Sequence, residues 1–165
     1  MARTDTSSVR IGTPDDVDGM MQIAIMGSDE NGFIPANPVK LLGEIWPALN
    51  KDRGLVGIIG KPGEQIEAAV LLRLGDMWYS DSMVVEEKAI FVHPDFRRGA
   101  LNRARTLFQF SKHVSDSLEL PLIIGVLSNA RTEAKIKLYE REFGPSSGSF
   151  FLYGAKTGSH VRSAN

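Results

Sequence analysis

The chain has 165 residues and a formal net charge of −1, with 42% hydrophobic and 24% charged residues, which is the composition of an ordinary globular protein. This length favours one domain, and no apolar run approaches the ~20 residues that a membrane-spanning helix needs. The absence of cysteine excludes disulfide scaffolds, iron–sulfur clusters and thiol nucleophiles, and the small net charge disfavours a protein that coats nucleic acid.

The two ends of the chain are polar and rich in small residues. The N-terminal stretch lacks the apolar centre of a secretory signal, so we expect a soluble, cytoplasmic protein. Residues 1–8 and 155–165 are expected to be disordered tails around a single domain that spans residues 9–154.

Helix and hairpin signals alternate in the N-terminal half. A short strand is expected at residues 9–11, and a helix then begins at Thr13, Pro14 and Asp16, where Thr13 caps the helix and Asp16 complements its dipole. This helix is expected to end near Gly27, before an irregular stretch at residues 28–38. A second helix at residues 39–49 and a hairpin of strands at residues 55–59 and 68–74 follow.

The C-terminal half predicts a crossover between strands. An extended segment at residues 83–92 precedes an amphipathic helix, whose apolar residues recur at three- and four-residue spacing as far as Leu118. A strand at residues 122–126, a helix at residues 130–142 and a last strand at residues 150–153 follow. The order β-α-α-β-β-β-α-β-α-β indicates a mixed α/β fold with a βαβ unit near its end.

The segment at residues 89–103 carries the strongest functional signal. A strand runs into a turn at Pro94 and then into a loop that opens directly onto a helix, where unpaired backbone N–H groups and the helix dipole suit phosphate oxygens. Gly99 and Ala100 leave the loop bare enough for a diphosphate to approach. Four positive charges fall within nine residues here, at Arg97, Arg98 and Arg103 in the segment and at Arg105 just after it. The pattern indicates an anion site, with a solvated basic helix start as the alternative.

Three parts of the chain resemble one family. Val92-x-Pro94-x-Phe96-Arg97 followed by a helix is similar to motif A of the GNAT-superfamily N-acetyltransferases, which holds the pyrophosphate of acetyl-CoA. Residues 9–16 are similar to the family's opening strand and helix, and residues 129–130 with 138–140 are similar to its motif B. The loop and residues 144–153 also resemble GNAT proteins encoded in phage or prophage genomes. Over residues 9–154 the resemblance implies a mixed, mostly antiparallel sheet flanked by helices, with a βαβ crossover at the acyl-CoA site.

The resemblance also implies an activity. We expect an N-acetyltransferase that uses acetyl-CoA as co-substrate and transfers the acetyl group to a primary amine of a small molecule or peptide, by direct attack in a ternary complex and without a metal. No nucleic acid and no membrane are expected as partners, and a homodimer is left open. The loop departs from the family pattern Arg/Gln-x-x-Gly-x-Gly/Ala, because it reads Arg97-x-x-Ala100-x-Asn102. A Cβ at these two positions restricts close backbone approach, which supports a non-catalytic binding or structural protein as the alternative.

The family pattern assigns roles to individual residues. Tyr139 stands where many GNAT enzymes keep the tyrosine that protonates the departing thiolate, with a packing tyrosine as the alternative. A carboxylate base is expected at Glu86 or Glu87, with Glu86 preferred; successive strand side chains point to opposite faces, so only one of the two can face the cleft. The expected cofactor-binding residues are Ile90, Phe91, Val92, Arg97, Arg98, Gly99, Ala100, Leu101, Asn102, Arg103 and Asn129.

Two further features have an expected role. Asp29 and Glu30 lie in the stretch that covers the acceptor site in the family, so they are candidates to bind an amine, with ordinary surface acids as the alternative. Trp78 is expected to pack in the fold or to line the wall of the cleft. No motif predicts the acceptor itself.

Overall fold

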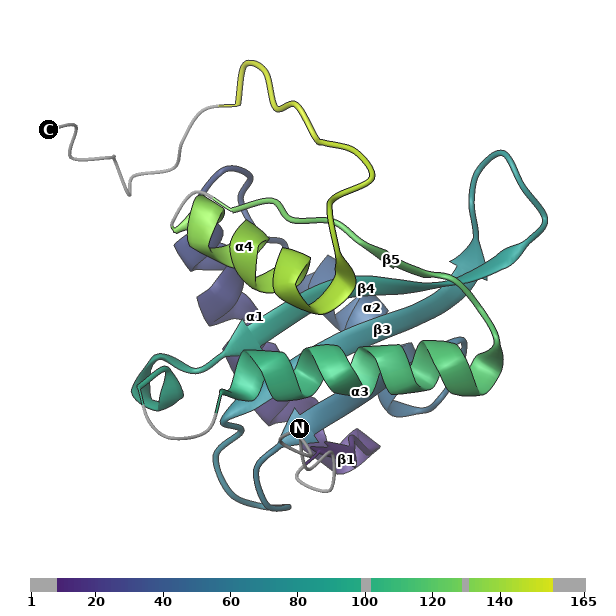
Figure 1. Cartoon of the computed structure of the whole chain (residues 1–165). Helices are drawn as coiled ribbons and strands as arrows, with labels where there is room; N and C mark the ends of the chain where they lie inside the picture. The colour runs from purple at the N-terminus through teal and green to yellow at the C-terminus, as the bar shows by residue number, and fades with distance from the viewer. Residues whose placement is uncertain (1–8, 99–101, 129–130, 156–165) are drawn as a thin grey trace, which may run out of the picture.

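The computed structural model describes residues 9–98, 102–128 and 131–155 (Figure 1). In chain order its elements are β1 (Val9–Ile11), η2 (Pro14–Asp16), α1 (Val17–Asn31), α2 (Pro38–Leu49), β2 (Gly54–Ile59), β3 (Ala68–Asp76), β4 (Met83–Val92), η3 (Pro94–Phe96), α3 (Arg103–Leu118), β5 (Leu122–Ile124) and α4 (Thr132–Phe143). Within these residues the five strands form one sheet in the order β1-β2-β3-β4-β5, antiparallel except between β4 and β5. The expected mixed sheet, with a helical crossover between two parallel strands, is therefore confirmed.

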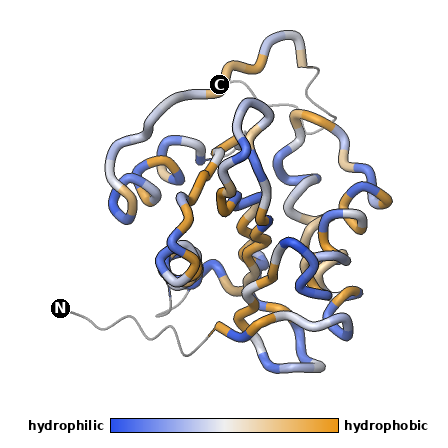
Figure 2. Tube along the Cα trace, turned by 90° about the vertical axis from the view of Figure 1, so that its right-hand side faces the viewer, coloured by the Kyte–Doolittle hydropathy of each residue, from blue (hydrophilic) through white to orange (hydrophobic). Residues whose placement is uncertain are grey.

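Helices cover both faces of the sheet. Figure 1 shows α3 and α4 in front of the strands and α1 and α2 behind them, and in Figure 2 hydrophobic stretches concentrate along the strands between these layers. One core joins α1 and α2 to the sheet through residues such as Met20 and Ile45, and the other joins α3 to the sheet through residues such as Leu107 and Phe110. Fully burying one such side chain stabilises a protein by about 1.5–3 kcal/mol. No helix in the described part of the chain is long and apolar enough to cross a membrane.

The first helix begins where the sequence indicated, and an ion pair reinforces it. The backbone N–H of Thr13 donates to Asp16 Oδ2 at 2.8 Å, and the Arg10 guanidinium donates to both carboxylate oxygens of Asp16 at 2.9 and 2.8 Å. These hydrogen bonds lower the pKa of Asp16, with the bond from Arg10 contributing most. The bonds fix the Asp16 carboxylate in the turn that leads into α1.

The expected end of α1 near Gly27 is wrong, because the helix continues to Asn31. It stops at Gly32, which adopts a left-handed conformation at φ 66° that glycine tolerates at no cost. Gly27 serves packing instead, because a Cβ at this position would collide with the ring of Phe91 on β4. The missing side chain therefore lets α1 lie directly against β4.

The last strand expected at residues 150–153 is also wrong. These residues form a coil in which Phe150, Phe151 and Tyr153 are exposed. β5 has only three residues and therefore offers a short edge for pairing. The run Phe150-Phe151-Leu152-Tyr153 also lacks the alternation of polar and apolar residues that would set a strand's register.

Candidate active site

β4 changes its pairing halfway along its length. On one side it pairs with β3, where the register shifts so that Leu71 lies opposite Ala89 and Leu72 opposite Glu87, which makes Lys88 an extra residue. On the other side it pairs with β5 only at Val85, Glu86 and Glu87. Among the described residues, the rest of β4 therefore has no strand partner on its β5 side. Such a bulge bends a strand and is frequent next to active sites.

Glu87 is a buried carboxyl at the point where the two strands separate. Its side chain is 5% exposed, and it accepts a hydrogen bond from Tyr139 Oη to Oε1 at 2.7 Å and one from Ser111 Oγ to Oε2 at 3.4 Å. Burial raises the pKa of Glu87 to about 7, an effect that the two hydroxyl hydrogen bonds only partly offset. A carboxyl with this pKa exchanges a proton readily near neutral pH.

Tyr139 reaches Glu87 from α4, 52 positions away in the chain. Its ring lies 4.2 Å from the Phe108 ring of α3 and 6.2 Å from the Phe143 ring of α4, measured between centroids. Burial raises the pKa of the Tyr139 phenol above its usual range, and the charge of Glu87 adds to the shift. The phenol therefore stays protonated and holds a hydrogen that it can donate.

Glu86 lies in different surroundings from Glu87. Successive strand residues face opposite sides of a sheet, and the Glu86 carboxylate pairs with Lys88 Nζ at 3.1 Å with 43% of its side chain exposed. Farther along β4, Ile90 and Val92 pack with the core under α3, whereas Phe91 packs with the core under α1. Of the two acids expected as base candidates, the structure brings Glu87, and not Glu86, next to Tyr139.

The arginine-rich loop lies directly after β4. Arg97 Nε donates to the Val92 carbonyl at 3.1 Å, and its two terminal nitrogens donate to the two carboxylate oxygens of Glu30. This bidentate pair lowers the pKa of Glu30. Arg98 is exposed. The remaining loop residues expected to bind the cofactor, Gly99, Ala100 and Leu101, lie outside the described residues, as does Asn129.

Asn102 and Arg103 make contacts within the protein at the start of α3. Asn102 Oδ1 accepts from the Arg105 backbone N–H at 3.1 Å and so caps the helix. Arg103 Nε donates to Glu67 at 2.7 Å, its Nη1 donates to the Phe96 carbonyl at 3.0 Å, and its guanidinium lies 5.0 Å from the centre of the Phe96 ring. Arg103 thus holds the turn after β4 against β3, and this role is visible only in the fold.

Sequence reasoning missed one member of the group around Glu87. Ser111 lies on α3 and was not singled out as a site residue, yet its hydroxyl contacts the Glu87 carboxylate and also the Leu107 carbonyl at 3.1 Å. A serine on an otherwise apolar helix face is the signal that could have identified it, because a buried hydroxyl needs a partner.

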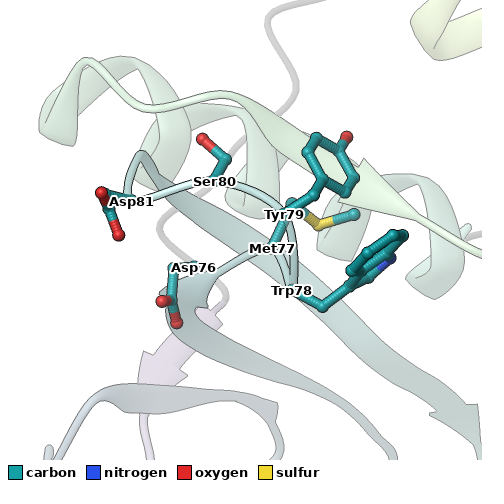
Figure 3. A pocket seen from close by; sticks show the side chains of 6 residues that line it. All are labelled: Asp76, Met77, Trp78, Tyr79, Ser80 and Asp81. Atoms are coloured by element: carbon teal, nitrogen blue, oxygen red, sulfur yellow. The ribbon is translucent and has the colours of Figure 1, made fainter.

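A separate hollow lies at the tip of the β3–β4 hairpin and is lined by residues 76–81 (Figure 3). The rings of Trp78 and Tyr79 meet edge to face with their centroids 5.3 Å apart. Trp78 is 93% exposed, so the expectation that it packs in the fold or lines the cleft is wrong. Neither Glu87 nor Tyr139 lines this hollow. We place the candidate site at those two residues, because a proton donor and a proton acceptor are hydrogen-bonded to each other there.

Comparison with known proteins supports this architecture. No family model and no curated protein matches the sequence. A possible acetyltransferase from Clostridium difficile 630 is similar in structure with a TM-score of 0.66 at 13% identity, over 90% of this chain and 97% of that chain. A GNAT family acetyltransferase from Staphylococcus aureus gives 0.58 at 17% identity, over 87% and 95%. An aminoglycoside N-acetyltransferase in complex with CoA gives 0.65 at 14% identity, over 88% and 91%. The chain therefore has the fold of the GNAT acetyltransferases, as the resemblance in its sequence implied.

Proposed function

We propose that this protein is an N-acetyltransferase that transfers the acetyl group of acetyl-CoA to a primary amine. The observation that carries the proposal is the 2.7 Å hydrogen bond from Tyr139 Oη to the buried Glu87 carboxylate, at the place where β4 leaves β5. A proton acceptor and a proton donor side by side suit a reaction that takes a proton from an amine and gives one to a thiolate. A structural neighbour that binds CoA on the same fold supports the choice of co-substrate.

The residues around β4 suit the binding of acetyl-CoA. Beyond Glu87, the backbone groups on the β5 side of β4 have no strand partner in the described residues, so they can hydrogen-bond to acetyl-CoA instead. The expected contacts are the backbone of Ile90 to Val92, whose N–H groups would polarise the thioester carbonyl, and Arg97 and Arg98 for the diphosphate. We propose that residues 99–103 and 129 also contact acetyl-CoA.

Glu87 and Tyr139 divide the proton transfers of the reaction between them. Glu87, with its pKa near 7, accepts the proton of the attacking amine. The amine nitrogen forms the new bond to the acetyl carbon, and the bond from that carbon to sulfur breaks. Tyr139 gives its proton to the departing thiolate and recovers one from Glu87 through their hydrogen bond. One proton thus passes from nitrogen to sulfur, and both side chains return to their starting state.

The acceptor is proposed as a class only. The neighbour with the CoA ligand is an aminoglycoside N-acetyltransferase, which agrees with a small-molecule amine. Release of free thiol from acetyl-CoA should be measured with a panel of polyamines, aminoglycosides and peptides. Amine-dependent thiol release that Glu87→Gln abolishes is the expected result.

A non-catalytic GNAT-fold protein is the second candidate. Two observations favour it: Arg97 is already paired with Glu30, and Asn102 caps the start of α3 where the family has a small residue. Calorimetric titration with CoA separates the two candidates. Tight CoA binding without thiol release for any amine would support the second candidate and refute the enzyme.

A further inference from the structure

The carboxylate of Glu30, near the C-terminal end of α1, is paired with Arg97 and interacts with the charges of two further cations. Arg97 donates to both of its oxygens, with 2.6 Å between Nη1 and Oε1. The charges of Arg131 and Lys135, at the start of α4, also contribute to the lowered pKa of Glu30. One carboxylate therefore faces cations from two segments that are more than thirty residues apart in sequence.

Two of the three cations, Arg97 and Lys135, are also held by contacts other than Glu30. Arg97 Nε is bound to the Val92 carbonyl at 3.1 Å, and Lys135 Nζ donates to Ser128 Oγ at 2.7 Å. Burial lowers the pKa of Lys135, so part of the hydration of its ammonium group is already lost. A site whose donors are positioned beforehand binds an anion with less loss of conformational entropy.

The Glu30 carboxylate occupies the two Arg97 donors that a phosphate group would use. The fork of an arginine meets a carboxylate and a phosphate in the same bidentate way. Glu30 is 42% exposed at a helix end, so it can leave without disturbing a core. The group also lies at the end of β4, beside the loop that the proposed function assigns to the diphosphate of acetyl-CoA.

We infer that Arg131 and Lys135 join Arg97 in the diphosphate site and that Glu30 occupies this site as an internal competitor until the co-substrate displaces it. The inference rests on the proposed function for the identity of the ligand. A diphosphate carries more negative charge than one carboxylate and gains more from three cations. Glu30 thereby lowers the affinity for CoA and excludes weaker anions. Arg131 and Lys135 become binding residues that no motif indicated.

Calorimetric titrations of the whole chain with CoA, inorganic diphosphate and pantetheine test the inference. Glu30→Gln should tighten the binding of CoA and of diphosphate about fivefold, equivalent to about 1 kcal/mol, which is the worth of an exposed ion pair. Lys135→Met should weaken both by a similar factor. Pantetheine has no phosphate, so its affinity should stay the same in every variant.

Asp29→Asn is the matched control, because it removes the same charge from the adjacent residue. It should leave the binding of CoA and diphosphate unchanged within about twofold. Equal CoA affinity in the wild type and Glu30→Gln, or equal tightening by Asp29→Asn, would overturn the inference while the proposed function stands. If diphosphate binding responds to Glu30→Gln but CoA does not bind, the competition by Glu30 is supported and the proposed function falls.

Discussion

Replacing Glu87 by glutamine should change the way in which the stability of this protein depends on pH. The carboxyl has a pKa of about 7 in the folded chain, against 4.5 for an ordinary glutamate, chiefly because it is buried. The unfolded chain therefore releases this proton at a lower pH than the folded chain does. As the pH rises from 4.5 to 7, ionisation favours the unfolded state and the free energy of unfolding falls.

The size of the effect follows from the two pKa values. Each pKa difference of one corresponds to about 1.4 kcal/mol, so above pH 7 the ionisation of Glu87 costs the folded state about 3 kcal/mol. Glu87→Gln keeps a side chain of the same length that can still accept a hydrogen bond from Tyr139, and it removes the ionisation. The variant should gain about 3 kcal/mol relative to the wild type between about pH 5 and pH 8.

Urea unfolding at several pH values, followed by far-UV circular dichroism, measures this difference. Glu86→Gln is the matched control, because it makes the same substitution at the adjacent residue, whose side chain is 43% exposed. Parallel stability profiles for Glu87→Gln and the wild type would refute the reasoning, since they would mean that burial does not raise the pKa of this carboxyl.

Three other predictions, which concern Tyr139, Gly27 and Asp16, give measurable outcomes. Tyr139→Phe should lower kcat by ~10²–10⁴-fold, because it removes the proton donor for the thiolate; an unchanged kcat would assign that role to another donor. The acidic limb of the pH–rate profile should also move to higher pH, because the hydroxyl no longer stabilises the charge of Glu87. Gly27→Ala should destabilise the fold by about 1–3 kcal/mol in thermal unfolding, because the added Cβ would meet the Phe91 ring. The control Gly43→Ala adds a Cβ in open space on α2 and should stabilise the fold by up to about 1 kcal/mol; equal effects of the two variants would contradict the close packing of α1 on β4. Asp16→Asn should lower the free energy of unfolding by about 1–3 kcal/mol at neutral pH and by much less in acid. The pKa of Asp16 is lowered in the folded chain, so the carboxylate stabilises the fold at neutral pH and loses this effect when acid protonates it; a pH-independent loss would argue against an ion pair.

Local signals in the sequence were enough to predict most of the fold. The strand expected at residues 83–92 has those bounds in the structure, and the helix start at Thr13 and Pro14 is confirmed. Capping residues, turn residues and side-chain alternation act over a few residues and can be recognised without knowledge of the fold. The arginine-rich loop was singled out by its charges before a helix, and Tyr139 and the two acids before Val92 by a family resemblance; their roles stay predictions.

Contacts between distant residues were decided only by the tertiary structure. Alternation showed that Glu86 and Glu87 face opposite sides, but only the packing of α3 and α4 on one face buries Glu87 and raises its pKa. The hydrogen bond from Tyr139 to Glu87 spans 52 positions and the pairing of Arg97 with Glu30 spans 67, and no local pattern encodes either. Burial and long-range pairing depend on how whole elements pack together, so the surroundings that give these residues their chemistry exist only in the folded chain.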